Sequence, residues 1–165
     1  MKNVFFIFFV LLLTDNLYSQ INVVVQPVSG SQYQFVFKST GLKANEFLWD
    51  ETEGFVNGFA KVTLNHLWTL VDANGVPVSA IKYEAVRNFY THIGAAKLNN
   101  KWGCIDEKGN TVIPFEYDII YDFKDAVTAG YKNNKWFLIN RQALIIKTLD
   151  VDVFYGFKNG IANIT

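Results

Sequence analysis

The chain has few of the side chains that metal chemistry and charge-driven recognition need. Its 165 residues include one cysteine, two histidines and three prolines, and 15 basic residues balance 15 acidic ones. Balanced charge argues against a surface that follows nucleic-acid phosphates. The scarcity of cysteine and histidine leaves little for metal ligation. We therefore expect no nucleic-acid partner, no cofactor and no metal site.

Apolar side chains are plentiful. Hydrophobic residues make up 50% of the chain and aromatic residues 16%. This composition excludes a disordered chain, which is poor in such residues. The length fits one domain that builds its core without disulfides or a structural metal.

The N-terminus carries the longest apolar run. Lys2 is followed by the apolar stretch from Val4 to Leu13, then by a polar break and Leu17-Tyr18-Ser19. This order is typical of a secretory signal peptide, and a ten-residue helix of about 15 Å is too short to cross a membrane. We predict a signal peptide over residues 1–19, cleavage after Ser19 and a secreted or periplasmic protein. The alternative is a buried first strand or helix of the fold.

The rest of the chain repeats every 34 residues. Phenylalanine occupies one column of this repeat and tryptophan another. The columns are Phe55, Phe89, Phe123 and Phe157; Trp68, Trp102 and Trp136; Asn65, Asn99 and Asn133; Asp72, Asp106 and Asn140; Gly75, Gly109 and Ala143; Val78, Val112 and Ile146; and Tyr83, Tyr117 and Val151. We divide the chain into units 55–88, 89–122 and 123–156, with a degenerate first unit over 20–54 and the start of a truncated unit over 157–165.

A period of 34 residues also fits paired helices, but the local chemistry favours strands. Residues 94–99 alternate with a period of two, which is typical of a half-buried strand. Asn99-Asn100 is a hairpin-turn signal, and Gly109 stands where a second turn is expected. Thr111-Val112-Ile113 is β-branched, and Pro114 is expected either to end that short strand or to place it at the edge of a sheet. Each unit thus predicts two full strands and a shorter third one.

These observations predict an all-β protein. The units of about 34 residues, each a three-stranded β-hairpin element, would stack as an open, curved array in which each unit buries its face against its neighbours. The alternative is a partial or closed propeller-like arrangement. It is less favoured because about 34 residues is short for a four-stranded blade.

The middle unit resembles the WG-repeat (KWG-type repeat) family of exported bacterial proteins. The resemblance rests on Lys101-Trp102-Gly103-Cys104-Ile105-Asp106, on the stretch from Gly109 to Pro114, and on Tyr117-Asp118. The neighbouring units depart from it, because Trp68 is followed by threonine, Trp136 by phenylalanine, and Ala143 replaces the turn glycine. The resemblance covers residues 55–165, and 20–54 more weakly. It implies a β-rich tandem array with no assigned catalytic activity.

The repeat columns separate structural residues from functional candidates. Cys104 aligns with Leu70 and Leu138, so it is expected to be a buried hydrophobic residue rather than a nucleophile. His66 aligns with turn asparagines, and His92 aligns with glycine and alanine. Both histidines are expected in solvated loops, which argues against Cys/His catalysis and a zinc site.

Two columns carry carboxylates. The column of Asp72, Asp106 and Asn140 precedes a turn, where a short side-chain oxygen accepts a backbone N–H. The column of Glu84, Asp118 and Asp152 forms a possible ladder of carboxylates, with Ca²⁺ binding as a minor alternative. Asn163-Ile164-Thr165 has the form of a glycosylation acceptor and receives no functional weight.

The tryptophan column allows two interpretations. Trp68, Trp102 and Trp136 each open an apolar strand, which favours a core ladder. The alternative is a platform of exposed rings that stacks against sugars.

No catalytic residue, cofactor-binding residue or metal ligand emerges from these comparisons, and the ligand-binding residues stay unknown. We predict a non-catalytic binding or interaction module for a protein or an envelope glycan. The alternative is an envelope-polymer hydrolase or an accessory subunit of one, which would gather non-repeating polar residues in one cleft. The apolar strand expected over 161–165 either docks as the final strand of the third unit or mediates self-association.

The export signal predicts the first residue of the mature protein. If it is cleaved after Ser19, the exported protein begins at Gln20, which N-terminal sequencing measures. Met1 retained on soluble cytoplasmic material would contradict the assignment.

Overall fold

A computed structural model describes residues 22–28, 30, 32–158 and 161–164. The predicted signal peptide lies outside the described residues. The part of the chain that the structure describes consists of strands, turns and loops and has no helix. Accordingly, it contains no helix of the length and apolar character that a membrane crossing needs.

The strands form five antiparallel sheets. In chain order these are β1 (Val23–Val28) with β2 (Gln32–Phe37); β3 (Glu51–Thr52) with β4 (Phe59–Leu64) and β5 (Leu67–Asp72); β6 (Ala85–Tyr90) with β7 (Ile93–Leu98), β8 (Lys101–Asp106) and β9 (Thr111–Tyr117); β10 (Ile119–Ile120) with β11 (Val127–Lys132), β12 (Lys135–Asn140) and β13 (Ile145–Leu149); and β14 (Phe154–Lys158) with β15 (Ile161–Ile164).

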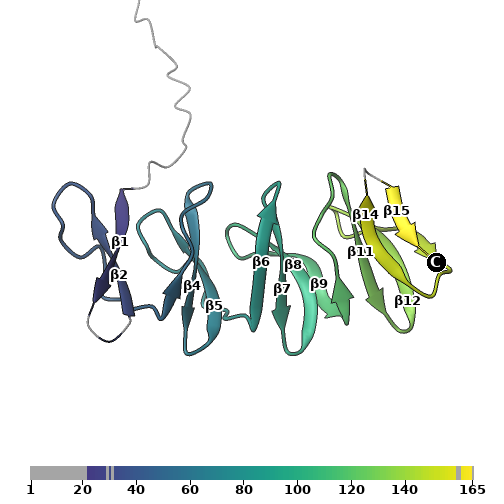
Figure 1. The fold of residues 1–165 in the computed structure, drawn as a ribbon, viewed down its shortest axis with the longest axis horizontal. Helices are drawn as coiled ribbons and strands as arrows, with labels where there is room; N and C mark the ends of the chain where they lie inside the picture. Colours follow the sequence, from purple (N-terminus) through teal and green to yellow (C-terminus); the bar gives the residue numbers. More distant parts are fainter. Residues whose placement is uncertain (1–21, 29, 31, 159–160, 165) are drawn as a thin grey trace, which may run out of the picture.

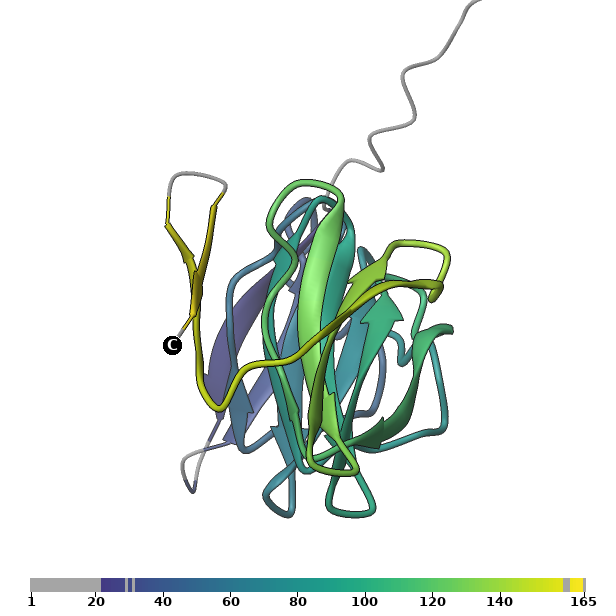
Figure 2. The ribbon, with the colours of Figure 1, turned by 90° about the vertical axis from the view of Figure 1, so that its right-hand side faces the viewer.

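The sheets follow one another along the longest axis of the molecule (Figure 1). The β1–β2 sheet lies at one end and the β14–β15 sheet at the other, so the array does not close on itself. Viewed along that axis, the sheets from β1 to β13 overlap, whereas the β14–β15 hairpin lies to one side of them (Figure 2). The all-β, open tandem array expected from the sequence is confirmed.

The asparagine pairs form the tight hairpin turns that the sequence predicts. Asn99 and Asn100 have φ angles of 51° and 61° and join β7 to β8. Asn65-His66 and Asn133-Asn134 adopt the same pair of positive φ values between β4 and β5 and between β11 and β12. Two consecutive residues with positive φ match the right-handed twist of the flanking strands. The repeat therefore encodes its own register.

The acidic column closes the second turn of each unit. The Oδ1 atom of Asp106 accepts the backbone N–H of Lys108 at 2.9 Å and that of Asn110 at 2.8 Å. Asp72 and Asn140 accept equivalent bonds in their own units. The sequence prediction of a turn-closing role for this column is confirmed.

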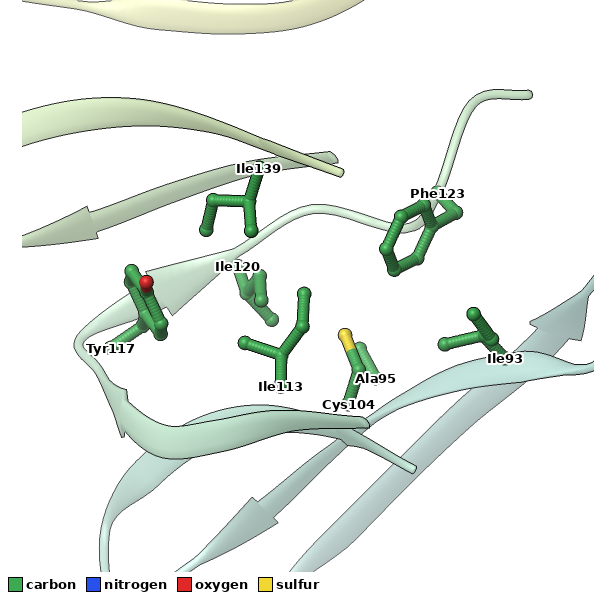
Figure 3. Close-up of a cluster of buried hydrophobic side chains, with 8 residues drawn as sticks. All are labelled: Ile93, Ala95, Cys104, Ile113, Tyr117, Ile120, Phe123 and Ile139. Atoms are coloured by element: carbon green, nitrogen blue, oxygen red, sulfur yellow. The ribbon is translucent and has the colours of Figure 1, made fainter. Parts of the chain in front are cut away.

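Four hydrophobic cores lie between the five sheets. The core between the β6–β9 and β10–β13 sheets contains Ile93, Ala95, Cys104, Ile113, Tyr117, Ile120, Phe123 and Ile139 (Figure 3). The neighbouring residue Ile105 belongs to the preceding core, together with Leu70 and Tyr83 of the upstream unit. Consecutive side chains of β8 thus point to opposite faces of the sheet, one towards the preceding sheet and one towards the following sheet. The central sheets are buried on both faces.

The structure corrects the expected strand count of a unit. Of the two expectations for Pro114, the edge strand agrees with the structure, and β9 continues past the proline to Tyr117. The proline is tolerated because β9 lies at the edge of its sheet, where a missing backbone N–H breaks no ladder. Residues 85–90, which lead into the turn before β7, also form a strand, β6. This sheet therefore has four strands rather than three.

The C-terminal strand does not become the final strand of the third unit, as one expectation had it. Residues Ile161–Ile164 pair with β14 in a separate two-stranded sheet. The reason is that residues 154–158 form a strand themselves and offer a nearer partner across a short connection. Phe154 joins the last core beside Trp136. Self-association through this strand stays a prediction.

Two glycines in the same backbone conformation test the packing between units. Gly75 has a φ of 75°, and a Cβ atom there would lie 2.4 Å from Phe35 Cδ2 of the first sheet. Gly41 has a φ of 68° with nothing within 4 Å of the same position. We expect Gly41→Ala to lower the free energy of unfolding by about 1–2 kcal/mol through backbone strain alone. Gly75→Ala is expected to cost about 1–3 kcal/mol more, because it also overpacks the interface. Urea unfolding measures both, and equal losses would contradict the interface.

Candidate functional site

A hollow with aromatic and charged walls lies where three consecutive sheets meet. We call it the downstream cleft; its volume is about 420 Å³. Its lining comes from the end of β6, from the segment between β10 and β11, and from β14. The lining residues are Arg87, Tyr90, Thr91, Tyr121, Asp122, Phe123, Lys124, Asp125 and Phe157. Another hollow of about 500 Å³, beside β13, has no aromatic side chain in its lining.

The same place in the preceding unit holds a smaller hollow of about 100 Å³, which we call the upstream cleft. Glu53, Val56 and Asn88 of the upstream cleft stand 34 residues before Arg87, Tyr90 and Asp122 of the downstream cleft. The segments leading into β4, β7 and β11 lie along one long edge of the array, the upper edge of Figure 1. The two clefts are therefore successive copies of one feature.

A buried lysine fills the upstream cleft. Lys61 is 7% exposed, and its Nζ lies 2.8 Å from Glu53 Oε2. The same ammonium group donates to Asn88 Oδ1 at 3.1 Å and to the carbonyl of Val86 at 3.5 Å, both in β6 of the next sheet. It also lies 5.6 Å from the ring centroid of Trp68. Such a satisfied lysine holds two units together and leaves little room for a ligand.

In the downstream cleft an arginine takes over this role. The position of Lys61 is occupied by Ala95, and the position of Glu53 by Arg87. The guanidinium of Arg87 stacks 4.2 Å from the ring centroid of Trp102 and donates to the carbonyl of Ile120 at 2.8 Å. The substitution of lysine by a small residue opens the space that the upstream cleft lacks.

The carboxylate of Asp122 has unused hydrogen-bonding capacity. Its Oδ1 atom is buried and accepts no hydrogen bond from the described residues. The nearest cation is the guanidinium of Arg87, at 3.7 Å, which is an ion-pair distance rather than a hydrogen bond. Buried acceptors are normally satisfied by the protein, by water or by a ligand. Asp122 is therefore the lining residue of the cleft whose side chain still has an acceptor without a hydrogen-bond donor.

Arg141 holds two turns at the border of the cleft together. Its Nε donates to the carbonyl of Asp125 at 3.0 Å, and its NH2 group bonds to the hydroxyl of Thr91. Its guanidinium also lies 5.9 Å from the ring centroid of Phe123. These contacts connect the third unit to the second and fix the spacing of the turns that line the cleft.

Cys104, which the sequence predicts to be a buried hydrophobic residue rather than a nucleophile, lines neither cleft. It is buried in the core between the two four-stranded sheets, as its alignment with leucine predicts. Burial raises the pKa of its thiol to about 12, with a smaller contribution from Asp122. His66 and His92 are exposed in turns, and His92 Nδ1 lies 3.0 Å from Glu107 Oε1. The structure therefore does not bring a histidine to Cys104.

The second carboxylate column serves hairpins. Glu84 accepts the backbone N–H of Asn100 at 2.9 Å, Asp118 pairs with Lys101, and Asp152 is exposed. Within the described residues, no group of three or more carboxylate, histidine or cysteine side chains is arranged to hold a metal ion.

The tryptophans pack as a core ladder rather than as exposed platforms. Trp136 is 5% exposed, and Trp68 and Trp102 are partly buried, each with a cation over its ring.

The residues of the downstream cleft were missed at the sequence level. Their signal lies in columns that change chemistry from unit to unit. Glu53, Arg87 and Tyr121 share one column, while Val56, Tyr90 and Lys124 share another. A repeat column whose residue type varies between units, beside columns that stay constant, marks positions where core packing does not determine the side chain. The structure brings the variable positions together in the lining of the clefts.

The family comparison agrees with the repeat pattern. A family model described as "WG containing repeat" matches residues 68–102 and again residues 102–136. These two segments are WG repeats. The matched segments run from β5 to the start of β8 and from β8 to the start of β12, so they include the residues that line the downstream cleft from Arg87 to Asp125. No curated protein sequence matches the chain.

Several solved structures resemble the WG-repeat array at low identity. BamB from Moraxella catarrhalis matches with 9% identity over 78% of this chain and 45% of its own, at a TM-score of 0.37. Hsv2p from Kluyveromyces lactis matches with 10% identity over 77% and 47%, at 0.44. The Pan2 WD40 domain from Neurospora crassa matches with 14% identity over 88% and 57%, at 0.35. The chain spans roughly half the length of these proteins.

The thiol of Cys104 provides a chemical probe of this arrangement. Because the thiolate is the reactive form and burial raises the thiol pKa to about 12, we expect very slow labelling at pH 8 in the folded protein. Labelling in urea should be faster by about a hundredfold or more, as both burial and the pKa shift are lost. Mass spectrometry of the labelled protein measures this ratio. Similar rates in both states would show that the second and third units do not cover the thiol.

Proposed function

We propose that this WG-repeat protein is a non-catalytic, exported binding module whose ligand occupies the downstream cleft. The observation that carries the proposal is that Asp122, whose buried Oδ1 has no hydrogen bond from the described residues, lines a hollow bordered by aromatic rings. A concave site with aromatic walls and a few converging polar groups is typical of ligand binding. The rigid β-array supports it, because its turns are fixed by contacts between units.

The N-terminal segment supports export. A lysine, ten apolar residues and a small-residue site follow one another in residues 1–19 as in a secretory signal peptide. An exported binding module meets envelope polymers and envelope proteins. The cleft is accordingly expected to face ligands of that compartment.

A hydrolase of envelope polymers is the second candidate, because one observation favours it. Asp122 and Asp125 both line the downstream cleft, and the aligned positions in other units carry asparagine, glycine or threonine. Glycoside hydrolysis uses two carboxyl groups on either side of the bond that is cut. Non-repeating polar residues in one cleft are the pattern expected of an enzyme or of an accessory subunit. Binding needs only the groups that are in place, so it remains our preferred function.

The experiment that tests the binding function compares variants on a common extract. Wild-type protein without residues 1–19 is immobilised and exposed to envelope extract, alongside the Tyr90→Ala and Asp122→Asn variants. We expect the wild type to retain extract components that both cleft variants lose, because each variant removes one wall of the cleft. The matched controls are Tyr155→Ala, an exposed tyrosine outside the cleft lining, and Asp150→Asn in the hollow beside β13.

The outcomes separate the two sites and the two functions. Retention that the cleft variants leave unchanged would contradict the proposed site, and loss only in Asp150→Asn would move it to the hollow beside β13. Release of new reducing sugar ends by the wild type, but not by Asp122→Asn, would establish the hydrolase instead. Circular dichroism of each variant verifies that the β-array is intact.

A further inference from the structure

We propose that the downstream cleft binds an uncharged glycan chain that runs along the edge of the array. This inference rests on the proposed function, since it names the ligand class of the same site. It is carried by the balance of charges in the cleft, by its exposed aromatic surface, by its mixture of donors and acceptors, and by its direction relative to the units.

The charges of the cleft cancel. Its lining contains two basic side chains, Arg87 and Lys124, and two acidic ones, Asp122 and Asp125. A strongly anionic ligand would meet both carboxylates, and a strongly cationic ligand would meet the guanidinium and the ammonium group. A ligand with charge of one sign gains little binding energy in such a site, because its attraction to one pair of side chains is offset by its repulsion from the other pair. The cleft favours a neutral ligand.

The same side chains match hydroxyl groups. A hydroxyl both donates and accepts hydrogen bonds, so it is satisfied equally by a carboxylate and by a cationic N–H group. Asp122 Oδ1 is a buried acceptor without a donor, and Arg87 is held beside it by Trp102. Hydrogen bonds to charged groups are stronger than those between neutral groups. A ligand with several neighbouring hydroxyls uses both residues at once.

Aromatic surface completes the match. Tyr90 is 49% exposed at one end of the cleft, and Phe157 is partly exposed where the cleft meets β14. The apolar face of a sugar ring packs on such rings while its hydroxyls point to the polar groups between them. A peptide would instead gain most from an unpaired strand edge or from an apolar groove. The combination in the cleft favours a sugar over a peptide.

The repeat sets the direction of the ligand. Residues 87–91, 121–125 and Phe157 occupy corresponding positions in three consecutive units, so the cleft extends from one unit to the next. Stacked sheets lie about 10 Å apart, which gives an elongated site rather than a round pocket. The Lys61–Glu53 pair fills the corresponding place upstream. A chain-like ligand therefore enters near Tyr90 and continues towards β14.

The test uses a defined set of probes with the intact chain without residues 1–19. Neutral hexasaccharides of β-linked glucose and of N-acetylglucosamine, an anionic uronic acid hexasaccharide and a lysine-rich peptide are titrated by calorimetry. We expect saturable binding of a neutral hexasaccharide, weakened about tenfold or more by Tyr90→Ala and by Asp122→Asn but unchanged by Tyr155→Ala. The affinity should change little between about 0.05 and about 0.5 M salt, because no ion pair joins the ligand to the cleft.

A second measurement keeps the ligand class separate from the proposed function. The extract components retained through the cleft are treated with protease or with periodate, which oxidises vicinal diols. We expect periodate to abolish retention and protease to leave it intact. Cleft-dependent retention that protease abolishes, or that depends steeply on salt, would overturn the glycan while the binding function stands. Absence of cleft-dependent retention would overturn the proposed function itself.

Discussion

Each central sheet of this protein depends on its neighbours because its strands are apolar on both faces. In β8, Cys104 is buried against the following unit, and Ile105 is buried against the preceding one. A single sheet with two apolar faces exposes too much hydrocarbon to be stable alone. The stability of a stacked array is therefore a sum of units and nearest-neighbour interfaces. The clefts arise where these interfaces are imperfectly filled.

Polar contacts between units follow the same spacing as the cores. The carbonyls of Val86, Ile120 and Phe154 stand 34 residues apart, and each accepts a hydrogen bond from a side chain of the preceding sheet or of the segment that directly follows its first strand. The donors are Lys61, Arg87 and Tyr121, three different side chains. The backbone acceptor is thus constant, while the donor varies. This variation permits a tight contact in the upstream cleft and an open one in the downstream cleft without a change in the array.

Much of the fold was predictable because it is locally encoded. The asparagine pairs and Gly109 have positive φ values, and such conformations are favoured by the identity of only one or two residues. The alignment of Cys104 with leucines predicted its burial. The sequence left open whether Pro114 ends its strand or lies at a sheet edge, because an edge position depends on sheet order rather than on neighbouring residues. The pairing of the C-terminal strand was missed for the same reason. Its partner depends on whether residues 154–158 form a strand, which the residues of the C-terminal strand do not reveal.

The downstream cleft was not predictable in this way. Its residues come from three units, and the space between them depends on Ala95 standing where Lys61 fills the preceding copy. Such a cavity follows from side-chain volumes across an interface, which a periodic pattern does not reveal. Repeat columns of variable residue type indicate candidate binding positions. Only the three-dimensional arrangement shows that Arg87 and Asp122 line the same cleft.

The central claim is that the interfaces between units carry the stability of both flanking sheets. Hydrogen exchange resolved strand by strand, on the wild type and on Ile105→Ala, tests it most directly, because Ile105 is fully buried between the second and third sheets. The account predicts faster amide exchange in both β4–β5 and β7–β8 of the variant, with β14–β15 least affected. Faster exchange confined to β7–β8, with β4–β5 unchanged, would show that the sheets are stable independently of their neighbours and would contradict the account.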